Sequence, residues 1–424
     1  MNLDILQARY PALLPDAFAK EVDNAAANVR VWRDYVVGNQ YIYLTEKQRR
    51  ALNIQTAPYR GFAANYMNMV ISMMAARLQV TGFVCSDPDW LAEWSSRNSF
   101  DALQSQLHTA LLREGDAFLL LDYDERNASC LRLAYPYDGK SGIIPIYDGY
   151  RLESAIKVWQ DGDTVHSDLW QEGVVHFTNR AYPGSYGGRS EVSDVISLQD
   201  ALNRIIASMI IAGELSAFQV RVAKGFNPPS SIEPGAIIPI KGTPEQLAQA
   251  DMYALQQGSL VEFISEIDRV IDLIAEITQT PIASVLGTNP SGEALKQRES
   301  GLIAKVKAAQ IAINDSWTSA LTMCYAADRL YAGASTDEFV AEVRWSGEDT
   351  RSIPGEVALA IQIYQATMDK TLLAQMLGDA LGWTLERQEE VLQRMIDAEA
   401  QHADQLLASI PGGAYLNGPR GRAE

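Results

Sequence analysis

The chain has 424 residues, of which 47% are hydrophobic and 21% charged, and this composition predicts a folded protein with two or three structural regions. Its 53 acidic and 35 basic residues give a formal net charge of −18, which argues against a protein that grips nucleic acid through its phosphates. The three cysteines lie far apart, no secretory signal is visible and no apolar run is long enough for a membrane, so we expect synthesis in a reducing compartment and no membrane partner.

Apolar residues at helical spacing predict three helices in the first part of the chain. The segments Asp16–Val37 and Tyr59–Leu78 repeat apolar residues every three or four positions. A third helix is expected over Trp90–Glu114, with Gly115 as its C-terminal stop.

Short strand-like segments follow, separated by turn-forming residues. Segments so closely spaced predict an antiparallel sheet set between helices. The expected strands cover residues 117–121, 130–133, 154–159, 165–170 and 174–177.

Two long helices flank an insertion in the middle of the chain. The first is expected to begin at Ser190 or Glu191 and to end near Phe218, and its apolar residues occupy so wide an arc that it must pack on more than one side. The second covers residues 262–279. The insertion between them, residues 219–261, contains two strand-like stretches.

The second of these helices carries five carboxylates and one basic residue, Arg269. A charged helix face is most often simply solvated, but a negative surface also suits the wall of a channel through which DNA passes without adhering. Composition alone leaves both interpretations open. The five acidic residues are Glu262, Glu266, Asp268, Asp272 and Glu276.

A loop punctuated by proline and glycine separates the acidic helix from a very long one. The loop, residues 280–291, has no charged side chain and is longer than a helix–helix connection needs. Gly292 begins a helix of roughly forty residues, about 60 Å long. The chain is therefore predicted to be α+β and mainly helical. Its last part is expected to contain a strand at 339–345, helices at 355–367, 371–381 and 384–407, and a loose tail.

No residue pattern predicts catalysis, a cofactor or a metal site. The Gly-rich segment 184–190 precedes a helix, but it lacks the Lys-Ser/Thr of a phosphate-binding loop, and a plain turn is the better interpretation. Asp122 and Asp124 share one strand face and form a candidate pair for magnesium, against the simpler reading of a solvated strand end. The histidines, which show no ligand spacing, are His108, His166, His176 and His402.

Several loose motifs occur in order along the chain. They are AARLQVTGF at 75–83, HFTN at 176–179 leading through YGGRSEV at 186–192 to LQDALN at 198–203, and SGEALK at 291–296 at the start of the long helix. In this order, and in a chain of this length, they resemble the portal protein family of tailed bacteriophages, of the long-tailed type. The resemblance covers about residues 59–330.

The resemblance implies a ring, typically of twelve copies, at one capsid vertex, through which double-stranded DNA is packaged and ejected. The large terminase, the major capsid or scaffolding protein and a head–tail adaptor are then the expected partners. The chain would be synthesised in the host cytoplasm and reside in the virion. The alternative is another virion structural or scaffold-type interaction protein that forms no DNA channel.

The resemblance also divides the chain into the parts of a portal fold. The acidic helix would line the channel, and the loop would contact the passing DNA through its tip. The expected parts are a wing (1–190), a two-helix stem (191–218 and 262–279), a small α/β clip (219–261), a tunnel loop (280–291), a long helix returning to the wing (292–338), and a helical crown with a C-terminal tail (339–424). The expected tip residues are Val285, Leu286, Gly287, Thr288, Asn289 and Pro290.

Overall fold

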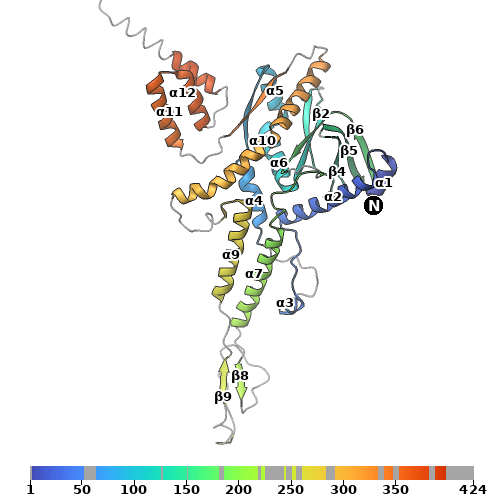
Figure 1. Cartoon of the computed structure of the whole chain (residues 1–424), viewed down its shortest axis with the longest axis vertical. Helices are drawn as coiled ribbons and strands as arrows, with labels where there is room; N and C mark the ends of the chain where they lie inside the picture. Colours follow the sequence, from blue (N-terminus) through green and yellow to red (C-terminus); the bar gives the residue numbers. More distant parts are fainter. Residues whose placement is uncertain are drawn as a thin grey trace, which may run out of the picture. The chain divides into compact units, whose positions relative to one another are not determined.

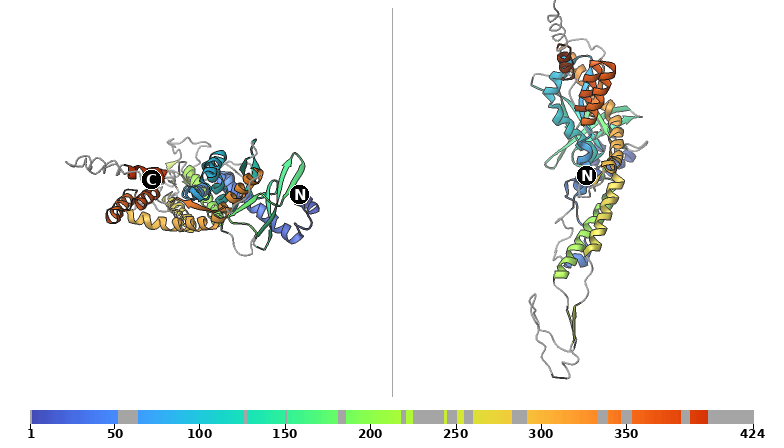
Figure 2. Two further views of the ribbon diagram at one scale, coloured as in Figure 1. Left: turned by 90° about the horizontal axis from the view of Figure 1, so that it is seen from above. Right: turned by 90° about the vertical axis from the view of Figure 1, so that its left-hand side faces the viewer.

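The computed structural model shows two compact units, which Figures 1 and 2 draw in sequence colours. Unit 1 comprises residues 1–75, 107–118 and 133–305, and unit 2 comprises residues 76–106, 119–132 and 306–424. The structure describes residues 2–51, 64–125, 128–149, 151–180, 186–217, 221–224, 243–244, 251–254, 260–282, 292–332, 339–346, 353–381 and 387–397.

In unit 1, two N-terminal helices cover an antiparallel sheet. The helices are α1 (Asn2–Arg9) and α2 (Asp16–Val37), and α2 has the predicted bounds. Their apolar side chains form a buried core with the sheet. The sheet has the order β4-β5-β6, with β4 at Gly142–Asp148, β5 at Arg151–Asp161 and β6 at Thr164–Trp170. Members of the core include Leu6, Leu14, Val22, Ala26, Ile144, Ile156 and Val165.

Strand β4 is not among the expected strands, and Pro145 lies in its middle. Proline has no N–H to donate, so it is tolerated in an edge strand and not in a central one. The strand is an edge of its sheet, and Pro145 pairs with Ala155 of β5. The prediction of one sheet was also too simple. A second sheet has the order β3-β2-β7, with β2 at Asp116–Tyr123, β3 at Ser129–Ala134 and β7 at Val174–Thr178.

The predicted helix over Trp90–Glu114 is two helices, so that prediction was wrong in one respect. Helix α5 (Pro88–Asn98) ends at Ser99, whose φ of 48° lies in the left-handed region. Helix α6 (Phe100–Glu114) begins directly afterwards and stops before Gly115, as expected. A serine in a left-handed C-cap gives little sequence signal, because glycine is the usual residue there.

Unit 2 is built on a two-stranded sheet and a cluster of aromatic rings. Strand β1 (Val80–Cys85) pairs antiparallel with β10 (Ala341–Trp345), so the helix predicted to reach Leu78 ends earlier, as α4 (Tyr66–Ala75) in unit 1. The rings of Phe83, Trp94, Phe100 and Trp317 contact one another in the core. Helices α11 (Ile353–Thr367) and α12 (Lys370–Leu381) and the helical residues 387–397 follow, close to the predicted positions.

Asp328 joins several segments of unit 2 through one carboxylate. It accepts hydrogen bonds from the indole N–H of Trp90 (2.9 Å) and from the guanidinium of Arg97 (2.9 Å). It also accepts from the backbone N–H (2.6 Å) and the hydroxyl (2.9 Å) of Ser129. This network fixes the helix that carries Asp328 against α5 and β3 inside the unit.

Two helices of unit 1 stand side by side and lead to a small strand pair at their far ends (Figure 1 and the right-hand view of Figure 2). They are α7 (Ile196–Ala217) and α9 (Leu260–Thr278), and the strands are β8 (Arg221–Lys224) and β9 (Asp251–Ala254). The predicted insertion therefore contains an antiparallel strand pair. Helix α10 covers Gly292–Tyr331, forty residues as predicted.

Helix α7 begins later than predicted. Residues 191–195 form turns, in which the N–H of Ser193 donates to Ser190 O and the N–H of Val195 to Val192 O. The N–H of Glu191 donates to the carbonyl of Leu112 (3.0 Å). These bonds hold the chain outside the helix until Ile196.

Candidate functional site

All five acidic residues singled out in the sequence are exposed on α9. At about 100° of rotation per residue they occupy an arc of about 160°. Arg269 lies within this arc, 3.8 Å from the carboxylate of Glu276. The surface is therefore strongly negative but not uniformly so. Its members are Glu262, Glu266, Asp268, Asp272 and Glu276, and we call it the acidic face of α9.

The opposite side of α9 is apolar and packs within unit 1. Ile271, Ile274 and Thr278 are buried there, and α7 is the neighbouring helix. The hydroxyl of Thr278 donates to Ile274 O (2.7 Å), so this polar group is satisfied inside the contact. An amphipathic helix of this kind turns its carboxylates away from its partner.

The wide apolar arc of α7 is only partly covered by its own chain. Ile205, Ile206, Met209 and Ile210 are half-buried, although α9 lies alongside and α3 (Glu46–Ala51) contacts α7 as well. The prediction that this helix packs on more than one side is therefore confirmed for α9 and α3. Part of its apolar surface remains accessible in the single chain.

The motif LQDALN fixes the start of α7 to the beginning of α4. The amide of Gln199 accepts from the N–H of Tyr66 (3.2 Å) and donates to the carbonyl of Ala64 (2.5 Å). The amide oxygen of Asn203 accepts from the N–H of Ala64 (3.1 Å). Both side chains are buried, so these bonds give backbone groups before the first turn of α4 a hydrogen-bond partner inside the protein.

A second bond from the same motif reaches α2. The hydroxyl of Tyr35 donates to the carboxylate of Asp200 (2.7 Å). Burial raises the pKa of Asp200, and the bond from Tyr35 only partly offsets this effect. Burial and the charge of Asp268 on α9 raise the pKa of Tyr66.

A buried ion pair joins α10 to the root of α7 and α9, by which we mean the chain just before α7 and the last turn of α9. Glu191 is buried just before α7, and its carboxylate contacts the ammonium of Lys305 and accepts from the amide of Asn179 (2.9 Å). The same ammonium donates to the carbonyl of Thr278 (2.9 Å), in the last turn of α9. Cations are favoured at the C-terminus of a helix. Lys305 therefore holds both helix ends at once.

The contacts of Lys305 with Glu191 and Thr278, which we call the joint at Lys305, were not predicted from the sequence. Lys305 is one of several basic residues on a long helix, and Glu191 lay at an expected helix start, where an acidic residue needs no special explanation. The available signal was the motif YGGRSEV, in which two glycines, an arginine and a serine precede Glu191.

The glycines of that motif allow two backbones to meet. A Cβ atom on Gly188 would lie 2.2 Å from the carbonyl oxygen of Gly115, and one on Gly115 would lie 2.7 Å from Gly188. Gly115 also has a φ of 85°, which only glycine adopts without strain. The N–H of Gly188 donates to Asp116 (2.8 Å), so it is occupied within the protein and supports a turn rather than a phosphate-binding loop.

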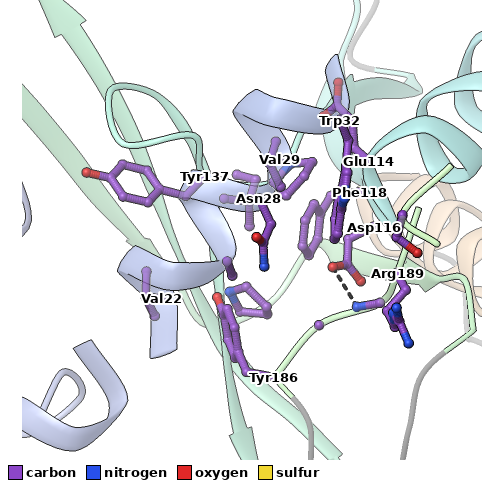
Figure 3. Close-up of a pocket in the computed structure, with 17 residues that line it drawn as sticks. Val22, Asn28, Val29, Trp32, Glu114, Asp116, Phe118, Tyr137, Tyr186 and Arg189 are labelled. Carbon is purple, nitrogen blue, oxygen red and sulfur yellow. Dashed lines mark hydrogen bonds between the residues drawn. The ribbon is translucent and has the colours of Figure 1, made fainter. Parts of the chain in front are cut away.

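The described part of this segment borders a cavity of about 320 Å³ (Figure 3). The labelled side chains of Asp116, Tyr186 and Phe118 surround it, and the dashed line marks the bond from Gly188 to Asp116. Glu114 also lines the cavity and is paired with Arg33. The carboxylates at this cavity are thus engaged in bonds that hold the fold.

The remaining polar candidates have structural partners. Asp122 pairs with Arg132, and Asp124 accepts from the N–H of Ala128 (2.9 Å), so they close a strand end. His176 stacks on Phe118 and contacts Asp116 at 2.8 Å. His166 stacks on Trp159, and His108 is buried. Across the described residues, no group of three or more His, Cys, Asp or Glu is placed to hold a metal ion.

The tip of the predicted tunnel loop and His402 lie outside the described residues. The described part of the loop ends at Ile282, which is buried, after Thr280 N–H donates to the carbonyl of Ala275 (3.0 Å). Within the described part of the chain, no helix combines the length and the apolar character needed to cross a bilayer.

Comparison with known protein families gives a match over more than half of the chain. Residues 178–401 match the family described as "Phage portal protein, SPP1 Gp6-like". The matched part contains the acidic face of α9, the joint at Lys305 and the whole of α10.

Two curated proteins are similar over most of their length. The portal protein of Mycobacterium phage L5 is 23% identical over 399 residues, which cover 81% of each chain. The portal protein of Mycobacterium phage D29 is 22% identical over 456 aligned positions, which cover 94% of this chain and 91% of that protein.

Among solved structures, chains from gene transfer agent particles are similar at 12% identity. A chain from the neck of an empty particle has a TM-score of 0.49 and covers 80% of this chain and 96% of its own. A chain from a native virion has a TM-score of 0.46 and covers 79% of this chain and 94% of its own.

Proposed function

Because the chain belongs to the SPP1 Gp6-like phage portal protein family, we propose that its copies close into a ring, of twelve subunits, whose central channel passes double-stranded DNA. Portal proteins are structural components of the virion, and no catalytic role is proposed. DNA packaging and ejection through one capsid vertex is the function that this arrangement serves.

The acidic face of α9 carries the proposal. Its carboxylates are exposed and point away from α7, so a ring that places α9 innermost has a negative lumen. DNA carries about one negative charge per 1.7 Å of its axis, so such a wall repels it and prevents adhesion. A channel needs this property, because a chain that moves through it must not be held.

The incompletely covered apolar arc of α7 supports the ring. In a cyclic assembly each subunit offers one surface to its left neighbour and a different one to its right. Half-buried side chains such as Ile206 and Met209 would then be covered by the next subunit. The described β8–β9 pair, in the predicted clip, is proposed to face the large terminase or a head–tail adaptor.

We expect the purified chain to form a closed ring across a range of salt and protein concentrations. Native mass spectrometry with light scattering measures the assembly directly. The expected mass is about twelve times that of the 46.7 kDa chain. A persistent monomer would contradict the ring, and an open or irregular polymer would favour a virion protein that forms no channel.

The predicted tunnel loop, residues 280–291, is proposed to contact the passing DNA. It has no charged side chain, so it would press on the DNA surface without gripping phosphates. Removing Leu286–Asn289 is expected to leave ring assembly intact and to impair DNA packaging or retention in a packaging assay. Normal packaging by rings of the shortened chain would show that the segment is only a connector.

A further inference from the structure

A second hollow in unit 1 is lined by basic side chains, in a chain whose net charge is −18. It has a volume of about 290 Å³ and lies between α2, the end of α6 and the strands β4 and β5. Arg33, Arg113 and Lys157 line it, together with Asp138 and an apolar wall that includes Tyr135 and Ile143. It belongs neither to the acidic face of α9 nor to the root of the two helices.

The arginines of this hollow are fixed in place by a buried carboxylate. Glu114 has a fully buried side chain, and both of its oxygens accept from Arg33 at 3.0 Å. Arg113 also donates to Glu114, from Nε at 3.0 Å, and lies over the ring of Tyr135. Two guanidinium groups therefore share one negative charge, and their orientation is set before any ligand arrives.

The carboxylate that lines the hollow, that of Asp138, is already engaged. Asp138 accepts from Arg33 (2.9 Å) and from the backbone N–H groups of Lys140 and Ser141 (both 3.0 Å). Burial acts to raise the pKa of Asp138, but these bonds outweigh it, and the pKa lies below its ordinary value. Asp138 is thus ionised and committed to Arg33.

Lys157 adds a positive charge that is in no ion pair within the described residues. Its cross-strand neighbour is Asp168, yet within the described residues its ammonium makes no ion pair and lies 5.6 Å from the ring centroid of Trp170. Arg33, Arg113 and Lys157 carry three positive charges against the two of Glu114 and Asp138. The hollow is therefore positive, with an apolar wall beside the charge.

We propose that this basic hollow, defined by Arg33, Arg113 and Lys157, receives an acidic side chain from a segment of a partner protein. A carboxylate on a short aliphatic stem fits both the cations and the apolar wall. Duplex DNA fits less well, because its phosphates need a row of cations along an open surface and the whole chain repels a polyanion. The proposal does not depend on the ring or on its channel.

The test uses the full chain and a labelled peptide of about ten residues in which Glu and Ala alternate. Fluorescence anisotropy at low and at physiological salt measures its binding. Lys157→Gln is expected to weaken binding about tenfold, and Arg113→Gln at least as much. Lys20→Gln, which removes an exposed charge on α2 far from the hollow lining, is the matched control and should leave binding unchanged.

The competing ligands are tested in the same assay. Duplex DNA of about twenty base pairs and inorganic phosphate are added as competitors, and neither is expected to displace the peptide at matched charge concentration. Absence of peptide binding, equal binding by the Lys157→Gln and parent chains, or displacement by DNA or phosphate would each overturn the proposal. Should Arg113→Gln fail to fold, Lys157→Gln still decides, because Lys157 is in no ion pair of the described structure.

Discussion

Replacing Lys305 by methionine is expected to loosen the root of α7 and α9 by about 3 kcal/mol. The substitution keeps the aliphatic stem but removes the ammonium that contacts the buried carboxylate of Glu191, which then keeps only Arg180, at 3.9 Å, as a neighbouring cation. It also removes the donor to Thr278 O in the last turn of α9. Amide hydrogen exchange of residues 271–278 measures the effect locally, and protection there should fall about a hundredfold.

The matched control is Lys307→Met, an exposed lysine two positions along the same helix. It should change protection by less than about twofold. The double variant Glu191→Gln/Lys305→Met removes both charges and should recover most of the lost protection, because no buried carboxylate is left without its cation. Equal protection in the Lys305→Met and Lys307→Met chains would show that the pair does not hold the root.

Reversing four charges on the acidic face of α9 is expected to make assembled rings retain DNA. The variant carries Lys at 262, 266, 272 and 276 and keeps Asp268, whose charge raises the pKa of Tyr66. The four replaced side chains are exposed, so the fold and the ring should persist. Retention should be strong at low salt and fall steeply as salt rises, because Lys–phosphate contacts release counterions. Filter binding of duplex DNA across a salt series measures it.

A second variant with the same net charge shows whether DNA retention depends on where the lysines lie or only on the net charge of the chain. Lys at 153, 161, 163 and 172 reverses four exposed acids on the β5–β6 hairpin and the turn before β7. Both variants raise the formal net charge of each chain by eight, from −18 to −10. We expect the hairpin variant to retain much less DNA. If the two bind DNA equally, or if neither binds more than the parent, the acidic face does not line the channel.

The long helices were predictable because their apolar spacing repeats over many turns, so a single atypical residue does not hide the pattern. The bounds of α2 and the forty residues of α10 follow from repeated apolar spacing between clear start and stop residues. The predictions failed where tertiary contacts changed what the local sequence favours. Backbone bonds of residues 191–195 delay the start of α7, and an edge position admits Pro145 into β4.

The charged residues of the candidate site were predictable, but the contacts that hold its helices in place were not. The acidic face of α9 was read from five carboxylates on one helix, and their exposure is confirmed. The joint of Glu191 and Lys305 joins residues 114 positions apart in sequence, and no local pattern specifies such a pair. The anchoring roles of Gln199 and Asn203 likewise depend on where the chain returns at Ala64.

Electron microscopy of the purified, assembled chain shows directly which helix lines the opening. We expect a closed ring with a central opening, in which α9 is the innermost helix of each subunit. The carboxylates of Glu262, Glu266, Asp272 and Glu276 should face that opening. A ring whose opening is lined by other elements, with the acidic face of α9 turned outward or covered by a neighbouring subunit, would contradict it.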